Sequence, residues 1–236
     1  MRYNMMYGFD PTYVLVLIGL VLSLIASGLV KSTFAKYSRV LSRRGITASM
    51  AAERILFAAG INDVTIRPVS GKLTDNYDPR NKTLNLSDGV MNSTSVAAIG
   101  VAAHECGHAI QHAKGYMPLK ARSLFVPVAN FGATVAWPLI LIGCLFSSQT
   151  GSLLITLGIL FFALAVLFHL ITLPVEFNAS RRAINNIQTM GILGEEEIGG
   201  TKKVLFAAAL TYVASAATAI LQLLRLVILF GGRRRD

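Results

Sequence analysis

The chain has 236 residues, of which 53% are hydrophobic and only 14% are charged, and its net charge is +10. This composition differs from that of an ordinary soluble domain and indicates membrane spans. The basic residues lie mainly beside apolar runs, as membrane-flanking residues do, so the positive charge does not predict a nucleic-acid partner. With only two cysteines, a disulfide framework is not expected.

Four apolar runs are long enough to cross a bilayer as helices, namely residues 14–30, 124–146, 153–173 and 204–230. Basic residues follow the first run and precede the second. By the positive-inside rule, the segment between them is cytoplasmic in a multi-pass protein of the cell membrane. The last run has a polar face and is followed by three arginines at 233–235. It either crosses the bilayer against that rule or lies along its surface or re-enters.

A short α+β region is predicted after the first run. Residues 47–59 read as a helix with Thr47 as its N-cap. Residues 64–67 and 83–86 alternate like strands, and residues 75–82 have turn chemistry, which together indicate a small antiparallel sheet. The last strand, residues 83–86, leads to the next helix, and as an exposed edge it would allow pairing with an extended peptide substrate. An ordinary closed hairpin is the alternative.

The next helix, residues 93–113, carries the motif His104-Glu105-Cys106-Gly107-His108, with Ser93 or Ser95 as its cap. Residues four apart lie one turn apart on a helix, so His104 and His108 can bind one ion. A zinc site with three protein ligands leaves a position for water, and Glu105 is placed to act as general base. The spacing therefore predicts hydrolysis by metal-activated water. Cys106 faces away from His104 and is expected to pack.

A third zinc ligand is needed, and three residues are candidates. His112 continues the histidine spacing, but each step of four residues rotates round the helix, so three histidines converge poorly. His169 lies inside an apolar run, where it would instead support a ligand or line a substrate path. Glu176 follows that run on the side of the metal helix, and we favour it because it completes a His-His-Glu-water shell.

The segment Glu176-Phe-Asn-Ala-Ser180 resembles the Glu-x-x-Ala-Asp element of the gluzincin membrane proteases. Ser180 replaces the aspartate that would orient a metal-binding histidine, and Ser180 or Asn178 is the candidate substitute. The chain as a whole resembles the bacterial YugP-like membrane zinc metallopeptidases. The matching stretches are residues 73–80, 84–87, 101–111 and 173–181. This resemblance implies a membrane-bound zinc endopeptidase of undefined substrate.

Two function classes follow. In the first, the protein is a zinc-dependent endopeptidase acting on peptide or membrane-protein substrates, with Glu105 as base and with Tyr116, His112 or Arg181 stabilising the oxyanion. In the second, it is a non-catalytic zinc-binding membrane scaffold or transporter-associated protein. The intact Glu105 argues against the second class, because a structural zinc site needs no base. Neither class fixes the oligomeric state.

The expected fold is an α-helical multi-pass membrane protein with a small α+β zinc-peptidase domain. Its parts are a transmembrane anchor, a cytoplasmic peptidase segment, a transmembrane hairpin, a helix and loop with the third ligand, and a C-terminal apolar helix with a basic tail. They occupy residues 1–30, 31–122, 123–173, 174–203 and 204–236, respectively.

Overall fold

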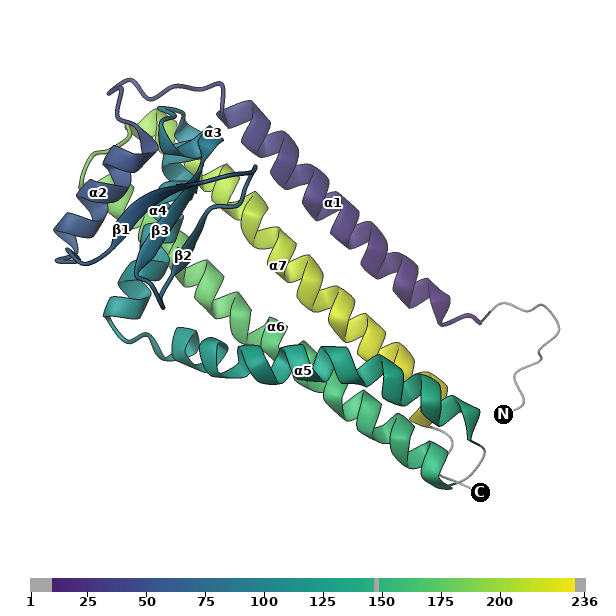
Figure 1. The fold of residues 1–236 in the computed structure, drawn as a ribbon. Coiled ribbons are helices and arrows are strands. Elements are labelled where there is room, and N and C mark those ends of the chain that lie inside the picture. Colours follow the sequence, from purple (N-terminus) through teal and green to yellow (C-terminus); the bar gives the residue numbers. More distant parts are fainter. Residues whose placement is uncertain (1–9, 147–148, 232–236) are drawn as a thin grey trace. The chain divides into compact units, whose positions relative to one another are not determined.

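The computed structural model describes residues 10–146 and 149–231 (Figure 1). Four long helices dominate it, and each is long and apolar enough to cross a membrane. They are α1 (Tyr13–Tyr37), α5 (Met117–Leu145), α6 (Gln149–Thr189) and α7 (Glu195–Phe230). Each corresponds to one of the predicted apolar runs. Residues 147–148, between the second and third predicted apolar runs, and the arginines at 233–235 lie outside the described residues.

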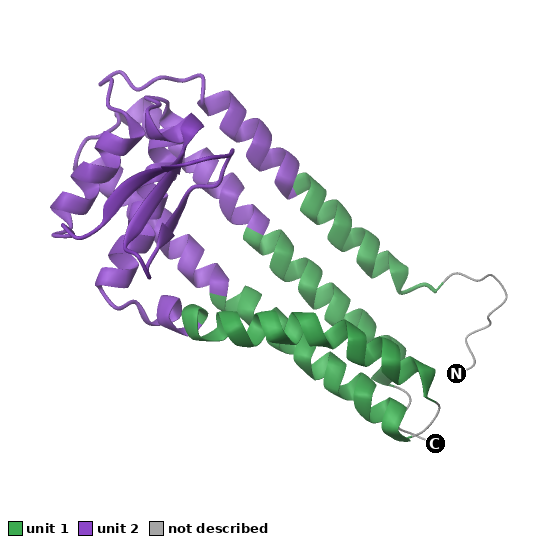
Figure 2. Ribbon diagram, viewed as in Figure 1, with its two compact units in different colours: residues 1–25, 122–171, 212–236 green, residues 26–121, 172–211 purple. Residues whose placement is uncertain are grey.

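The chain forms two compact units (Figure 2). The helical unit, green in the figure, holds residues 1–25, 122–171 and 212–236, and the sheet-containing unit, purple, holds residues 26–121 and 172–211. All four long helices contribute to both units. The prediction of a mostly helical fold with one small sheet is confirmed.

In the helical unit, small residues allow the helices to approach closely. A Cβ atom built on Gly158 of α6 would lie only 2.8 Å from the carbonyl oxygen of Ala136 on α5. Between α1 and α7, the Thr218 hydroxyl donates a hydrogen bond to the carbonyl of Gly19 over 3.0 Å. The Thr218 bond satisfies a polar side chain within an apolar helix, which a helix inside a bilayer would require.

In the sheet-containing unit, α2 (Ala48–Ala58) packs against α4 (Val96–Ala113) through buried alanine and isoleucine side chains. Both helices begin where the sequence predicts. The Thr47 hydroxyl accepts a hydrogen bond from the third backbone N–H of α2, and the Ser95 hydroxyl does the same for α4, each over 3.2 Å. Of the two predicted caps of the metal helix, Ser95 is therefore the N-cap.

The sheet has three strands in the order β1-β3-β2, followed by the short helix α3 (Asp88–Met91). The strands are β1 (Thr65–Val69), β2 (Asn76–Asp78) and β3 (Thr83–Ser87). β3 pairs antiparallel with β2 but parallel with β1. The prediction of an antiparallel sheet is thus wrong for the pair β1 and β3. The alternative, a closed two-stranded hairpin, is excluded by the third strand. The segment predicted as a turn, residues 75–82, contains β2.

The reason for this topology is the burial of β3. Leu84 and Leu86 are both completely buried, so β3 takes the centre of the sheet and has a neighbour on each side. The link from β1 to β2 includes Gly71, whose φ of +115° favours glycine. Asp75 at the end of this link accepts a 2.7 Å hydrogen bond from the backbone N–H of Ser87. Such pairing between distant segments is invisible to local sequence patterns.

Candidate metal centre

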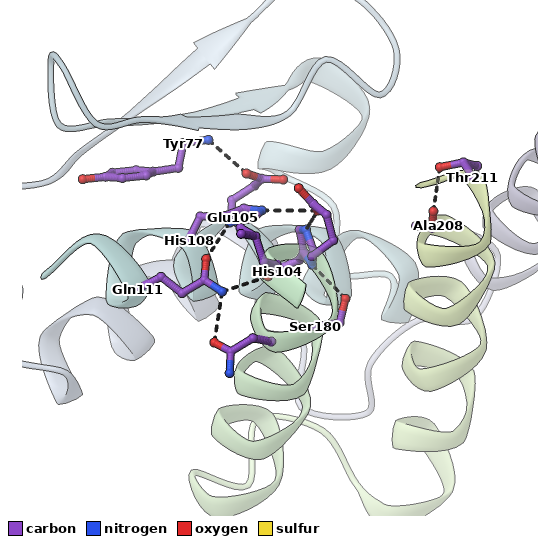
Figure 3. A network of polar contacts seen from close by, with 11 residues as sticks. Tyr77, His104, Glu105, His108, Gln111, Ser180, Ala208 and Thr211 are labelled. Carbon is purple, nitrogen blue, oxygen red and sulfur yellow. Dashed lines mark hydrogen bonds and ion pairs between the residues drawn. The ribbon is translucent and has the colours of Figure 1, made fainter. Parts of the chain in front are cut away.

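His104, His108 and Glu176 converge on one point in the sheet-containing unit (Figure 3). The histidines lie one turn apart on α4, and Glu176 comes from α6. The Oε2 atom of Glu176 lies 3.2 Å from Nε2 of His104 and 3.5 Å from Nε2 of His108. Their ligand atoms all lie within 4.8 Å of one another. Two imidazole nitrogens and one carboxylate oxygen form a donor set that zinc accepts, with a fourth position left open.

A hydrogen bond to the second ring nitrogen orients each histidine. Nδ1 of His104 lies 3.1 Å from the Ser180 hydroxyl, and Nδ1 of His108 lies 3.0 Å from Oε1 of Gln111. Because an amide oxygen only accepts, Nδ1 of His108 donates, which leaves its Nε2 lone pair for a metal. Both Nε2 atoms face Glu176. Hydrogen bonds to the other ring nitrogen commonly orient metal-binding histidines in this way.

Gln111 is completely buried and links α4 to α6. Its side-chain N–H groups donate to the carbonyl of Val175 over 2.8 Å and to Oδ1 of Asn178 over 3.0 Å. Asn178 also accepts from the guanidinium of Arg182 over 2.7 Å. Of the two candidates to replace the aspartate of the resembling proteases, Ser180 therefore contacts a histidine directly, while Asn178 acts on His108 through Gln111.

We expect Ser180→Ala to weaken zinc binding about tenfold, the lower end of the effect of outer partners of metal ligands. The change removes the hydroxyl that fixes the His104 ring but leaves all three donor atoms in place. Zinc affinity, measured by competition with a chromogenic chelator, checks this. Ser70→Ala, on an exposed loop, is the matched control. Unchanged affinity in Ser180→Ala would contradict an orienting role.

Gly107 allows α4 and α6 to approach closely beside the ligands. A Cβ atom built there would lie 2.6 Å from the carbonyl oxygen of Ala179. Because this neighbour is backbone, it cannot move aside without shifting α6, which carries Glu176.

We expect Gly107→Ala to destabilise the protein by about 1–3 kcal/mol, the usual cost of overpacking. Thermal unfolding of the detergent-solubilised chain measures this. In Gly199→Ala, on α7, the new methyl group meets no atom within 4 Å, and the change should be neutral or slightly stabilising. An equal response of the two variants would show that the close approach at Gly107 does not matter.

Glu105 lies beside the three candidate ligands, and only 8% of it is exposed. Its Oε2 accepts a 2.9 Å hydrogen bond from the backbone N–H of Tyr77 on β2 (Figure 3). Burial raises the pKa of Glu105, although the nearby histidines His104 and His108 oppose this effect. One oxygen of the carboxylate is thus tied to the edge of the sheet.

Among the oxyanion candidates, His112 is bonded through Nδ1 to the Tyr77 hydroxyl over 2.8 Å. The ring of Tyr116 lies under the guanidinium of Arg182, 5.9 Å from the ring centre. Arg181 lies on an exposed face of α6. None of these residues belongs to the group of converging donors found among the described residues, and their roles in oxyanion stabilisation remain predictions.

Two further residues considered in the sequence, His169 and Cys106, do not contribute to the metal centre. His169 lies on α6 in the helical unit and is not among the converging donors found in the described part of the chain. Cys106 packs as predicted, since it is completely buried and its thiol donates to the carbonyl of Ala52 over 3.6 Å. Sequence reasoning missed two residues that do take part in the site, Gln111 and Tyr77, which bond to His108 and Glu105. Gln111 stands three residues after His108, a spacing that places the two side chains side by side on a helix.

Two histidines from an H-E-x-x-H helix and a glutamate from a later helix define the metal-binding architecture of a zinc metallopeptidase. The chain belongs to the family described as "Putative neutral zinc metallopeptidase", whose model matches residues 12–231. It is 49% identical over 201 residues to the "Putative membrane protease YugP" of Bacillus subtilis (strain 168). The aligned residues make up 85% of this chain and 88% of that protein. No solved structure matches. The resemblance noted in the sequence is confirmed.

Proposed function

We propose that the protein is a membrane-bound zinc-dependent endopeptidase that cleaves peptide bonds with water. The convergence of His104, His108 and Glu176, with Glu105 beside them, is the observation that carries the proposal. The donor atoms fit zinc. The Gln111 amide oxygen leaves Nε2 of His108 available to it, and the Ser180 hydroxyl can accept from Nδ1 of His104 and so do the same for that ring. The family and the relative's name support the same class of activity.

In this mechanism, the protein's own groups position and move protons. When bound to His104, His108 and Glu176, zinc supplies a Lewis acid that polarises the scissile carbonyl and lowers the pKa of water. Oε2 of Glu105 is held by the N–H of Tyr77, which leaves Oε1 to accept the proton of a water. Glu105 accepts the water proton as the new C–O bond forms, and then gives it to the leaving amine nitrogen as the C–N bond breaks.

The edge of the sheet nearest to Glu105 is β2, and we infer that the substrate backbone lies along it. In an antiparallel strand, the N–H and C=O of one residue point to the same edge. The N–H of Tyr77 points to Glu105, so its carbonyl faces the same side and can accept a hydrogen bond from a substrate N–H. The prediction that residues 83–86 form the pairing edge is wrong, since β3 is paired on both sides, and we propose β2 instead.

We further propose a multi-pass location in the cell membrane with the metal centre on the cytoplasmic side. The four apolar helices support membrane insertion. The basic residues that bracket the site segment, from Lys31 to Arg44 and from Lys114 to Arg122, support the orientation by the positive-inside rule. This placement near the membrane surface favours membrane-associated polypeptides as substrates.

A cysteine introduced at Ser70 tests the orientation. In a Cys144→Ala background, we expect an impermeant maleimide to label it only after the cells are opened, because Ser70 is exposed on the predicted cytoplasmic segment. Cys106 is completely buried and should not react. Labelling of intact cells would place the metal centre on the outer side.

The alternative, a non-catalytic zinc-binding scaffold, is less well supported. A structural zinc site is normally closed by four protein ligands, whereas three donors converge among the described residues. Glu105 is also buried beside these donors, where a carboxylate without a task would be costly.

Peptide cleavage by the detergent-solubilised full chain tests the proposed function. We expect new peptide termini, identified by mass spectrometry from a peptide library and from unfolded membrane polypeptides, and their loss after metal chelation. Added zinc should restore cleavage. Cleavage that persists after chelation would overturn zinc dependence, and zinc binding with no cleavage of any substrate would favour the scaffold. Cleavage of soluble peptides alone would count against membrane-associated substrates.

A further inference from the structure

A groove lies between the α6 and α7 segments of the sheet-containing unit. Its volume is about 730 Å³, within the roughly 300–1,000 Å³ of pockets that hold small molecules. Its wall includes Ser180, whose hydroxyl is bonded to His104. The groove is therefore next to the metal centre but contains none of its three donor residues.

Three cations line the groove: Arg181 from α6, and Lys202 and Lys203 from α7. All three are exposed, and within the described residues no carboxylate forms an ion pair with any of them. By comparison, Arg43 in the same unit pairs with Glu196 at 2.7 Å. The groove thus concentrates positive charge that the described protein does not neutralise, which suits an anionic ligand.

The remainder of the groove is largely apolar. Phe177 of α6 and Phe206 of α7 line it, and they are 45% and 60% exposed. Large exposed aromatic side chains beside a cationic cluster fit a molecule that is both charged and hydrophobic. A soluble phosphate would use the cations only and leave both rings in water.

The groove also lies at a defined level along the two helices. The apolar run of α6 ends at residue 173, and that of α7 begins at residue 204. The cations at 181, 202 and 203 therefore stand just beyond the apolar parts of two candidate membrane spans. This is the level of lipid headgroups, where Lys and Arg meet anionic lipids.

We propose that this groove binds an anionic phospholipid of the surrounding membrane, with its phosphate between Arg181, Lys202 and Lys203 and an acyl chain along Phe177 and Phe206. The binding does not depend on peptidase activity, so its test is independent of the proposed function. Because Ser180 belongs to both sites, the lipid would lie against the residue that orients His104.

Association of spin-labelled phosphatidylglycerol with the full chain in phosphatidylcholine vesicles tests the proposal. We expect the preference for phosphatidylglycerol over phosphatidylcholine to fall at least about tenfold in the triple variant Arg181→Gln/Lys202→Gln/Lys203→Gln, since each cation near an anionic surface contributes a factor of roughly five. The triple variant Arg67→Gln/Lys72→Gln/Arg80→Gln removes the same charge from exposed positions around the sheet and should keep the preference. Equal losses in both variants would overturn the proposal.

A second measurement locates the lipid. In a Trp137→Phe background, Phe206→Trp provides a single fluorophore in the groove, and brominated phosphatidylglycerol should quench it more strongly than brominated phosphatidylcholine. Equal quenching by both lipids would overturn the assignment. Displacement of the spin-labelled lipid by soluble glycerophosphate would show a phosphate site instead, and displacement by an acidic peptide would show a protein-binding groove.

Discussion

Glu105→Gln is expected to lower kcat for peptide cleavage by about 100- to 10,000-fold, the usual contribution of a general base. Glutamine has nearly the same shape and can still accept the Tyr77 N–H through its amide oxygen, but it cannot take a proton from water. The three donor residues are unchanged, so zinc should bind with nearly wild-type affinity. Cleavage rates and zinc content, measured on the same preparation, check both halves of this result.

Glu53→Gln, at an exposed position of α2, is the matched control and should cleave normally. Equal cleavage by Glu105→Gln and wild type would remove Glu105 from the mechanism while leaving metal binding intact. Loss of zinc along with activity would instead give Glu105 a structural role in the site.

The parts of the site that follow from local geometry could be predicted from the sequence. His104, Glu105 and His108 lie within two turns of one helix, where spacing alone fixes which side chains share a face. Ser95 begins this helix because its hydroxyl reaches an N–H three residues on. The assignment of Glu176 needed one further inference, that two apolar runs return the chain to the side it left. In the structure, Glu176 lies beside both histidines.

The parts that depend on pairing between distant segments could not be predicted. Tyr77 stands in a segment rich in Asp, Asn and Pro, which reads as a turn because these residues favour turns locally. It forms a strand because β3 offers a free edge, and α4 lies beside that edge and supplies Glu105. The parallel pairing of β1 with β3 likewise depends on the burial of Leu84 and Leu86. An alternating pattern predicts that strands exist but not their order in the sheet.

Glu176→Gln is expected to weaken zinc binding more than about 100-fold, because loss of an outer partner alone costs 10- to 100-fold and this change replaces a charged donor with a neutral amide. The carboxylate of Glu176 is almost completely buried, and its Oε2 faces both histidines. The neutral amide keeps the volume of the side chain but loses the negative charge that attracts the metal cation. Chelator competition measures the affinity, and the rise in Tm on adding zinc should disappear in parallel.

Glu197→Gln is a demanding control, because Glu197 is also a buried glutamate of the sheet-containing unit. It accepts hydrogen bonds from the backbone N–H groups of Arg43, over 2.8 Å, and Gly194, over 2.7 Å, and it lies outside the metal centre. Its replacement should lower stability while zinc affinity is unchanged. If Glu176→Gln bound zinc normally and His112→Ala or His169→Ala did not, the third ligand would be that histidine. Loss of affinity in Glu176→Gln alone therefore separates the three candidates that the sequence offers.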